Sequence, residues 1–136
     1  MAGKAPLRPQ GALAVKVQLV EDSSVVRERL ASLLAESKGI EVVGQAARAA
    51  EAIEAFQQLR PQVVILDLQL AEGTGFDVLK NLKQQRPAPL ILVLTNYAYP
   101  QYRQKCLELG ADFFFDKATE FDQVLKVVRQ LLPAEG

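Results

Sequence analysis

The stretch Val63-Val64-Ile65-Leu66-Asp67 decides the fold, because an unbroken apolar run ends directly in a carboxylate. The stretch Leu90-Ile91-Leu92-Val93-Leu94 is apolar in the same way and ends in a threonine. Strands that are apolar on both faces are typical of parallel sheets covered by helices on both sides. We therefore predict a buried parallel sheet, with Asp67 placed where one of its strands ends.

Outward from this stretch, strand and helix patterns alternate along the whole chain. Further strands are predicted at residues 15–19, 40–44 and 111–115, the second of them near a sheet edge. Amphipathic helices are predicted over residues 26–34, 49–59, 76–85, 100–110 and 119–132, the last opening with a capping box of Thr119 and Asp122. Five strand–helix units predict an α/β, flavodoxin-like doubly wound sheet, (βα)5, of five parallel strands in the order 2-1-3-4-5.

The composition fits one folded unit without a basic surface. The chain has 136 residues, of which 49% are hydrophobic, and its formal net charge is +0. We predict a flexible lead-in over residues 1–11, one domain over residues 12–132 and a short tail over residues 133–136. The charge balance gives no support for non-specific binding to nucleic acid or acidic membranes.

Cysteine and histidine usage narrows the chemistry further. Cys106 is the single cysteine, which excludes an intramolecular disulfide, and no apolar run approaches the length of a membrane span. A cytoplasmic protein is therefore predicted. The chain contains no histidine, which excludes a histidine base, a histidine-ligated metal and a phosphohistidine.

Reactive side chains follow four of the predicted strands. Glu21 and Asp22 follow the first, Asp67 the third, Thr95 the fourth and Lys117 the fifth. In a doubly wound sheet the ligand lies at the carboxyl ends of the strands, near the point where the strand order reverses. We therefore expect three carboxylates from two neighbouring strands to converge there.

Such a cluster favours a hard divalent cation. Neighbouring carboxylates repel one another, and Mg²⁺ binds oxygen ligands while keeping several waters that phosphoryl oxygens can displace. With a lysine and a threonine beside it, the cluster suits phosphoryl transfer to Asp67. Each residue alone has a structural explanation. Asp22 could serve only as a helix N-cap, Thr95 could be an ordinary strand residue and Lys117 an ordinary surface lysine.

At this point the sequence resembles the response-regulator receiver domains of two-component signalling, in the manner of a stand-alone, chemotaxis-regulator-like receiver. The matching segments occur in the family's order and cover nearly everything between Val15 and Leu132. They are Val20-Glu21-Asp22, Ile65-Leu66-Asp67-Leu68, Gly73-Thr74-Gly75, Val93-Leu94-Thr95 and Gly110-Ala111-Asp112 through Lys117.

The resemblance implies a role for each site residue. Asp67 would be phosphorylated by a partner histidine kinase or phosphotransfer protein, with only slow self-dephosphorylation and no other enzyme activity. Thr95 and Lys117 would contact the phosphoryl group, and Phe114 would be the switch aromatic that turns inward when Thr95 moves. Mg²⁺ (or Mn²⁺) would be held by Glu21, Asp22, Asp67 and the backbone carbonyl of Gln69.

Three residues depart from the family pattern. Ala118 replaces the proline that usually follows the lysine, so we expect a trans Lys117–Ala118 bond and a shifted loop. Asn96 replaces a small residue, and we expect it to slow phosphorylation by small donors. Ala71 replaces another proline and should only loosen its loop.

The chain shows no output domain, so we expect it to signal through a surface. The predicted face is formed by the fourth helix, the fifth strand and the fifth helix, with Tyr97, Tyr99, Tyr102 and Phe114. A homodimer or a downstream protein would bind there. Phe113 and Phe115 are predicted to pack in the core.

Two other functions stay open at this point. A pseudo-receiver would bind its partner without phosphorylation, as the Ala118 and Asn96 departures suggest. A Mg²⁺-dependent phosphohydrolase with an aspartyl-phosphate intermediate usually has a second aspartate two residues after the nucleophile, and this chain has Gln69 there. A nucleotide-binding domain is disfavoured, because Glu21-Asp22-Ser23-Ser24 is not a glycine-rich loop.

Overall fold

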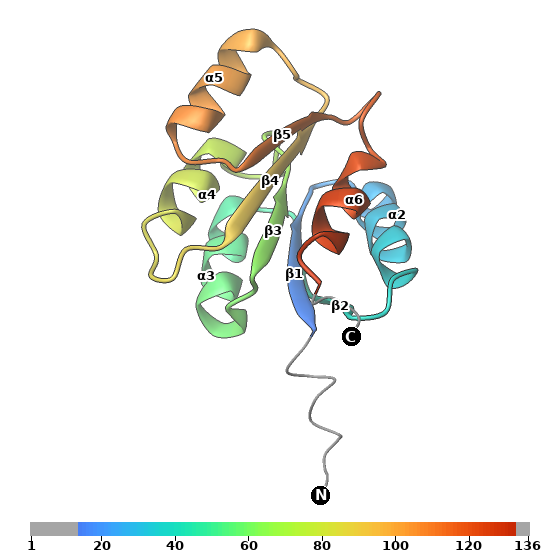
Figure 1. The fold of residues 1–136 in the computed structure, drawn as a ribbon. Helices are drawn as coiled ribbons and strands as arrows, with labels where there is room; N and C mark the ends of the chain where they lie inside the picture. Colours follow the sequence, from blue (N-terminus) through green and yellow to red (C-terminus); the bar gives the residue numbers. More distant parts are fainter. Residues whose placement is uncertain (1–13, 133–136) are drawn as a thin grey trace, which may run out of the picture.

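A computed structural model describes residues 14–132 and shows one parallel sheet between two layers of helices (Figure 1). The strands are β1 (Val15–Val20), β2 (Ile40–Ala46), β3 (Val63–Leu66), β4 (Leu90–Thr95) and β5 (Phe113–Asp116). The helices are α2 (Ser24–Ala35), α3 (Ala49–Leu59), α4 (Gly75–Leu82), α5 (Pro100–Glu108) and α6 (Gln123–Arg129). The strand order is β2-β1-β3-β4-β5 with every neighbouring pair parallel, which confirms the predicted fold class.

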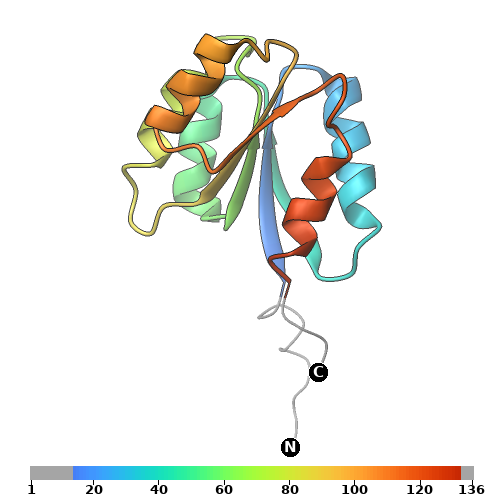
Figure 2. The ribbon, with the colours of Figure 1, turned by 45° about the horizontal axis from the view of Figure 1, so that its top comes forward.

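The helices cover the two faces of the sheet unequally (Figure 2). Helices α3, α4 and α5 lie on one face, and α2 and α6 lie on the other. Successive side chains of a strand point to opposite faces, so β3 contributes residues to the hydrophobic core on each side of the sheet. Val64 and Leu66 pack toward the three-helix layer, while Val63 and Ile65 pack toward α2 and α6. This double burial is what the unbroken apolar run predicts.

The prediction for the last helix was wrong at its start. α6 begins at Gln123, and its N-cap residue Asp122 makes no side-chain capping bond, so the predicted capping box does not form. The Asp116 carbonyl instead accepts hydrogen bonds from the N–H groups of Thr119 (3.3 Å) and Glu120 (2.7 Å). These bonds close a turn directly after β5, and this turn occupies the place of the first predicted helical residues.

The other helix and strand boundaries differ from the predicted ones by a few residues at most. The prediction for residues 49–59 matches α3, whereas α4 ends at Leu82, three residues before the predicted end. The last strand is displaced to Phe113–Asp116. The predicted lead-in (residues 1–11) and tail (residues 133–136) lie outside the described residues. Within residues 14–132, no helix has the length and apolar character needed to cross a membrane.

Candidate functional site

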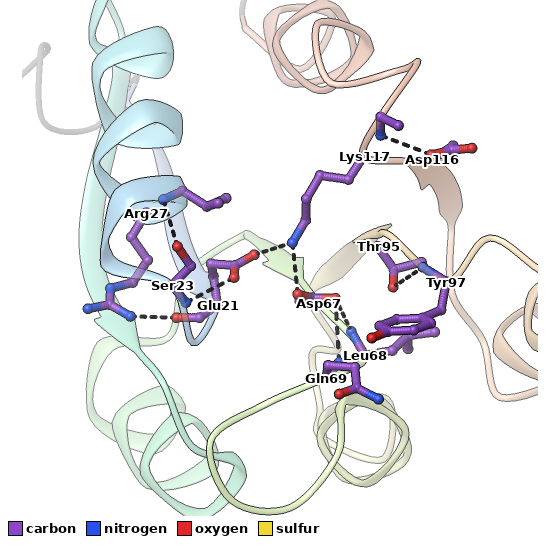
Figure 3. A network of polar contacts seen from close by, with 12 residues as sticks. Glu21, Ser23, Arg27, Asp67, Leu68, Gln69, Thr95, Tyr97, Asp116 and Lys117 are labelled. Atoms are coloured by element: carbon purple, nitrogen blue, oxygen red, sulfur yellow. Dashed lines mark hydrogen bonds and ion pairs between the residues drawn. The ribbon is translucent and has the colours of Figure 1, made fainter.

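Three carboxylates converge at the carboxyl end of β1 and β3, and Figure 3 shows two of them, Glu21 and Asp67. Val20 and Leu66 are paired in register, so Glu21 and Asp67, the next residues, emerge side by side. One carboxylate oxygen from each of Glu21, Asp22 and Asp67 lies within 4.8 Å of the others. Glu21 and Asp67 are buried, whereas Asp22 is exposed at the rim. The sequence prediction therefore placed the acidic cluster in the right part of the fold.

Lys117 bridges the two buried carboxylates. Its Nζ lies 2.8 Å from Glu21 Oε1 and 2.9 Å from Asp67 Oδ2, and only 10% of its side chain is exposed. The Lys117 N–H donates to the Thr95 carbonyl at 2.8 Å, which fixes the residue against the end of β4. The lysine predicted from the fifth strand end thus reaches the carboxylates that follow the first and third strands.

The Asp67 carboxylate is held at both oxygens. Oδ1 accepts a hydrogen bond from the Leu68 N–H at 2.7 Å, while Oδ2 faces Lys117. The Asp67 N–H donates to the Val20 carbonyl at 2.9 Å. Charge-assisted bonds of this kind orient a carboxylate firmly. Asp67 is therefore presented in a fixed direction, with 6% of the residue exposed.

Gly75 allows α4 to begin in direct contact with the backbone of Asp67 and Leu68. A Cβ at Gly75 would lie 2.2 Å from the Asp67 carbonyl oxygen and 2.7 Å from the Leu68 Cα, so only glycine fits there. The Gly75 N–H also donates to the Leu68 carbonyl at 2.9 Å. The second glycine of the Gly73-Thr74-Gly75 segment is thus explained by a close backbone approach beside the candidate phospho-acceptor.

The acidic loop after β1 is fixed by residues that the sequence prediction did not use. Ser23 is the N-cap of α2 and accepts the Val26 N–H at 3.2 Å, so the alternative that Asp22 is the cap was wrong. The Ser23 N–H donates to Glu21 Oε2 at 3.0 Å, and Arg27 Nη1 donates to the Glu21 carbonyl at 2.6 Å. The sequence carries no spacing signal for this contact, because Arg27 reaches back six residues to a backbone carbonyl before the helix.

The buried charges in this site are not balanced. Burial raises the pKa of Glu21 to about 7, although the hydrogen bond from Lys117 opposes the shift. Burial alone would lower the pKa of Lys117, but its hydrogen bonds to Asp67 and Glu21 raise it overall. One ammonium therefore serves two buried carboxylates and a third at the rim. An all-oxygen donor set with surplus negative charge fits a hard divalent cation.

Thr95 is the last residue of β4, and Phe114 lies within β5. Thr95 is fully buried, and its hydroxyl accepts the Tyr97 N–H at 3.0 Å. Phe114 is only 6% exposed and belongs to the core on the α3–α5 side. Its predicted place on a partner-binding surface was therefore wrong, because the side chain alternates inward along β5. Its neighbours Phe113 and Phe115 are half-buried and pack against the core on the other side.

The peptide bond after Lys117 is trans, as expected from Ala118, and the expected shift of the loop stays a prediction. Among residues 14–132 the cis peptide bond is Arg86–Pro87, so the Lys117–Ala118 bond is trans. The Ala118 N–H donates to Asp116 Oδ1 at 2.9 Å, a bond that a proline could not make. The predicted trans bond is confirmed. Gln69 and Asn96 are exposed, and their expected roles stay predictions.

Comparison with known proteins gives a consistent set of relatives. An uncharacterized response regulatory protein of Vibrio cholerae serotype O1 is 37% identical over 84% of this chain and 47% of its own length. The uncharacterized transcriptional regulatory protein YhcZ of Bacillus subtilis is 34% identical over 82% of this chain and 52% of its own length. The chain thus spans about half the length of these curated relatives.

Solved structures agree with the fold. The signal receiver domain of the putative response regulator NarL from Mycobacterium tuberculosis superposes with a TM-score of 0.79 at 25% identity, covering 86% of this chain and 94% of that one. The Mn²⁺-bound form of response regulator Rcp1 superposes with a TM-score of 0.73 at 24% identity, covering 88% and 99%. The sequence model of the response regulator receiver domain matches residues 17–129. The chain therefore belongs to the response regulator receiver domain family of two-component systems.

Proposed function

We propose that this chain is a phospho-acceptor response regulator that receives a phosphoryl group on Asp67. The observation that carries the proposal is the bridging of Asp67 and Glu21 by Lys117, with Asp22 within reach of the same point. An ammonium and a cation site on either side of one oriented carboxylate can stabilise the charge of a transferring phosphoryl group. The donor is a histidine kinase or a histidine phosphotransfer protein.

The residues present fit a divalent metal ion. Glu21, Asp22, Asp67 and the backbone carbonyl of Gln69 would hold Mg²⁺ or Mn²⁺, and the fold neighbour Rcp1 has a Mn²⁺-bound form. When bound, the metal supplies positive charge to the phosphoryl oxygens. The residues of the chain do the remaining work: they fix the acceptor, exclude bulk water and place Lys117 beside the incoming group.

In the transfer step, an Asp67 carboxylate oxygen forms a bond to phosphorus as the nitrogen–phosphorus bond of the partner's phosphohistidine breaks. Lys117 neutralises one phosphoryl oxygen, and the Thr95 hydroxyl donates to another. Water later breaks the acyl phosphate and restores the carboxylate. The chain thus dephosphorylates itself and turns over no other substrate.

The signal leaves through the face formed by α5, β5 and α6. Tyr99 and Tyr102 on this face are 52% and 36% exposed, and aromatic residues of this kind often anchor interfaces. A downstream protein or a second copy of the chain would bind there. We place the protein in the cytoplasm, because its single cysteine fits a reducing compartment. We expect no nucleic-acid or membrane partner, because the formal net charge is +0.

Intact mass with and without a phosphodonor tests the proposal. Incubation with acetyl phosphate and Mg²⁺ should add the mass of one phosphoryl group, stable to acid and lost in base, and Asp67→Asn should remove the gain. A chain that gains no mass and binds no Mg²⁺ would be a pseudo-receiver. Rapid turnover of a small phosphate ester would instead indicate a phosphohydrolase.

A further inference from the structure

The loop between β3 and α4 is docked against the loop between β2 and α3. The Ala71 N–H donates to the Ala47 carbonyl at 2.9 Å, and the Ala49 N–H donates in the other direction, to the Glu72 carbonyl, at 2.9 Å. The two bonds join segments that are distant in the sequence. We call this contact the loop junction, and its members are residues 47–49 and 71–73.

Helix α3 uses the loop junction as its amino-terminal cap. The first N–H groups of a helix have no partner inside the helix and need an outside acceptor. Within the described residues, the N-cap residue Arg48 makes no side-chain capping bond. The Glu72 carbonyl instead accepts the N–H of Ala49, the first residue of the helix. Because Ala49 is buried, separation of the two loops would leave this backbone group poorly paired.

Gly73 allows the two loops to approach this closely. Its φ of +78° is a conformation that residues with a side chain rarely adopt. A Cβ at Gly73 would lie 2.5 Å from the Ala49 Cβ, so a larger residue would push the loops apart. The ion pair of Arg48 and Glu72 is 3.6 Å long and largely exposed, so it adds little to the contact. The loop junction therefore depends on backbone bonds and close packing.

Ala71 is essential to this arrangement because it has an N–H group. The proline that the family usually has at this position could not donate to the Ala47 carbonyl. The expectation that Ala71 only loosens its loop does not account for this bond. The restraint that a proline ring gives from within the loop is replaced here by a restraint from a second loop.

The same loop carries Gln69, whose backbone carbonyl is a proposed metal ligand. The Gln69 N–H donates to Asp67 Oδ1 at 3.4 Å (Figure 3). The base of the loop is closed by the Gly75 N–H, which donates to the Leu68 carbonyl at 2.9 Å, and by a bridge between Gln69 and Thr74. A loop that is closed at its base and docked at residues 71–73 holds the Gln69 backbone in a fixed place.

We infer that the loop junction positions the Gln69 carbonyl for the divalent metal ion, with the Ala71 N–H···Ala47 carbonyl bond as its main link. This inference rests on the proposed function, since it requires a metal ion at the acidic cluster. The junction residues are positioning residues, because they act through Gln69. The effect is reciprocal: if the junction strengthens Mg²⁺ binding, bound Mg²⁺ must strengthen the junction by the same factor.

The Mg²⁺ affinity of the full chain, measured by calorimetry without a phosphodonor, tests the inference. Ala71→Pro removes the N–H and should weaken Mg²⁺ binding by about threefold to tenfold, the value of one hydrogen bond. Ala71→Ser keeps the N–H at an exposed position and should leave the affinity within about twofold. Equal affinity in the proline, serine and wild-type proteins would overturn the inference and leave the proposed function standing.

A packing variant keeps the inference testable if Ala71→Pro does not fold. Gly73→Ala places a Cβ against the Ala49 Cβ and should weaken Mg²⁺ binding. Ala49→Gly, added to Gly73→Ala, removes that contact and should restore part of the affinity. Wild-type affinity in Gly73→Ala, or no recovery in the double variant, would contradict the positioning role.

Hydrogen exchange of the wild-type protein gives a readout that needs no variant. Saturating Mg²⁺ should slow exchange of the Ala49 and Ala71 N–H groups by about the factor that Ala71→Pro costs in affinity. Unchanged exchange of both groups at full Mg²⁺ occupancy would overturn the inference alone. A wild-type protein that binds no Mg²⁺ would overturn the proposed function, and the inference with it.

Discussion

The two ends of the sheet pair their charges in opposite ways, and only the carboxyl end does so with buried carboxylates. At the amino end, Lys83 Nζ lies 2.7 Å from Asp112 Oδ2 and donates to the Pro89 carbonyl at 2.8 Å, and the same Asp112 oxygen accepts the Ile91 N–H at 2.8 Å. One cation meets one anion there. At the carboxyl end, a single lysine, Lys117, faces two buried carboxylates and a third nearby.

The difference separates a structural charge pair from a reactive one. The amino-end pair joins α4, β4 and the loop before β5, and it is complete without a ligand. The carboxyl-end group carries surplus negative charge, and burial, which disfavours the charged form, raises the pKa of Glu21 to about 7. Such a group is stabilised by an added cation, so the imbalance itself indicates where a ligand binds.

The largest effect is expected from Lys117→Met. Removal of the ammonium should slow phosphorylation by acetyl phosphate by about 10²- to 10³-fold, because one charge-stabilising group is lost. It should also destabilise the metal-free protein by roughly 3–5 kcal/mol at pH 8, since two buried carboxylates lose their partner. Phosphorylation rate and urea unfolding with and without Mg²⁺ measure both.

Lys83→Met is the matched control at the other end of the sheet. It should lower stability while leaving the phosphorylation rate within about twofold, since Lys83 lies far from the reacting atoms. Equal loss of rate in the two lysine variants would remove the distinction between the two ends.

The next effect concerns pH. In the metal-free fold the pKa of Glu21 is raised to about 7, whereas in the unfolded chain it has its ordinary value of 4.5. Its contribution to stability therefore rises as pH falls from about 7 toward 4.5. Mg²⁺ needs the ionised carboxylate, so Mg²⁺ affinity should fall about tenfold per pH unit below the Glu21 pKa.

Calorimetric Mg²⁺ titrations at several pH values check this dependence. Glu21→Gln should weaken Mg²⁺ binding at pH 8 and flatten the pH profile between pH 8 and about pH 5. A steep profile that persists in the glutamine variant would show that another group controls the titration.

A smaller effect is expected at the amino end. Asp112→Ala leaves the N–H of the buried residue Ile91 without an acceptor and should cost about 1–3 kcal/mol. Asp122→Ala, at an exposed cap that makes no side-chain bond, is the control and should cost within about 0.5 kcal/mol. Thermal unfolding compares them, and equal losses would contradict the structural role of the Lys83–Asp112 pair.

The smallest effect is expected from Asn96→Ala. Asn96 directly follows Thr95 and is exposed at the carboxyl end of β4, where it can narrow the approach to Asp67. The alanine variant should be phosphorylated a few-fold faster by acetyl phosphate. The control, Gln101→Ala on exposed α5, should leave the rate unchanged, and an unchanged rate in Asn96→Ala would discard the steric explanation.

The fold could be predicted because its signals are local. The apolar runs at 63–66 and 90–94 require a sheet covered on both faces, and the same runs place Asp67 and Thr95 at strand ends. The convergence of Glu21, Asp22, Asp67 and Lys117 follows from the strand order, so it too could be predicted.

What could not be predicted depends on contacts between distant segments. The late start of α6 comes from the turn closed by the Asp116 carbonyl, which competes with a favourable helical pattern. The part played by Arg27 depends on its reaching back to the Glu21 carbonyl. The buried position of Phe114 depends on which face of β5 meets the core, and three consecutive phenylalanines hide that alternation.

The position of the phosphoryl group tests the central claim most directly. The chain is phosphorylated by acetyl phosphate in Mg²⁺, reduced with borohydride to convert an aspartyl phosphate to homoserine, and digested for peptide mass spectrometry. We predict homoserine at position 67 alone, formed only when a divalent metal is present. Homoserine at another aspartate, or none after the metal and donor are shown to be active on a known receiver, would contradict the account.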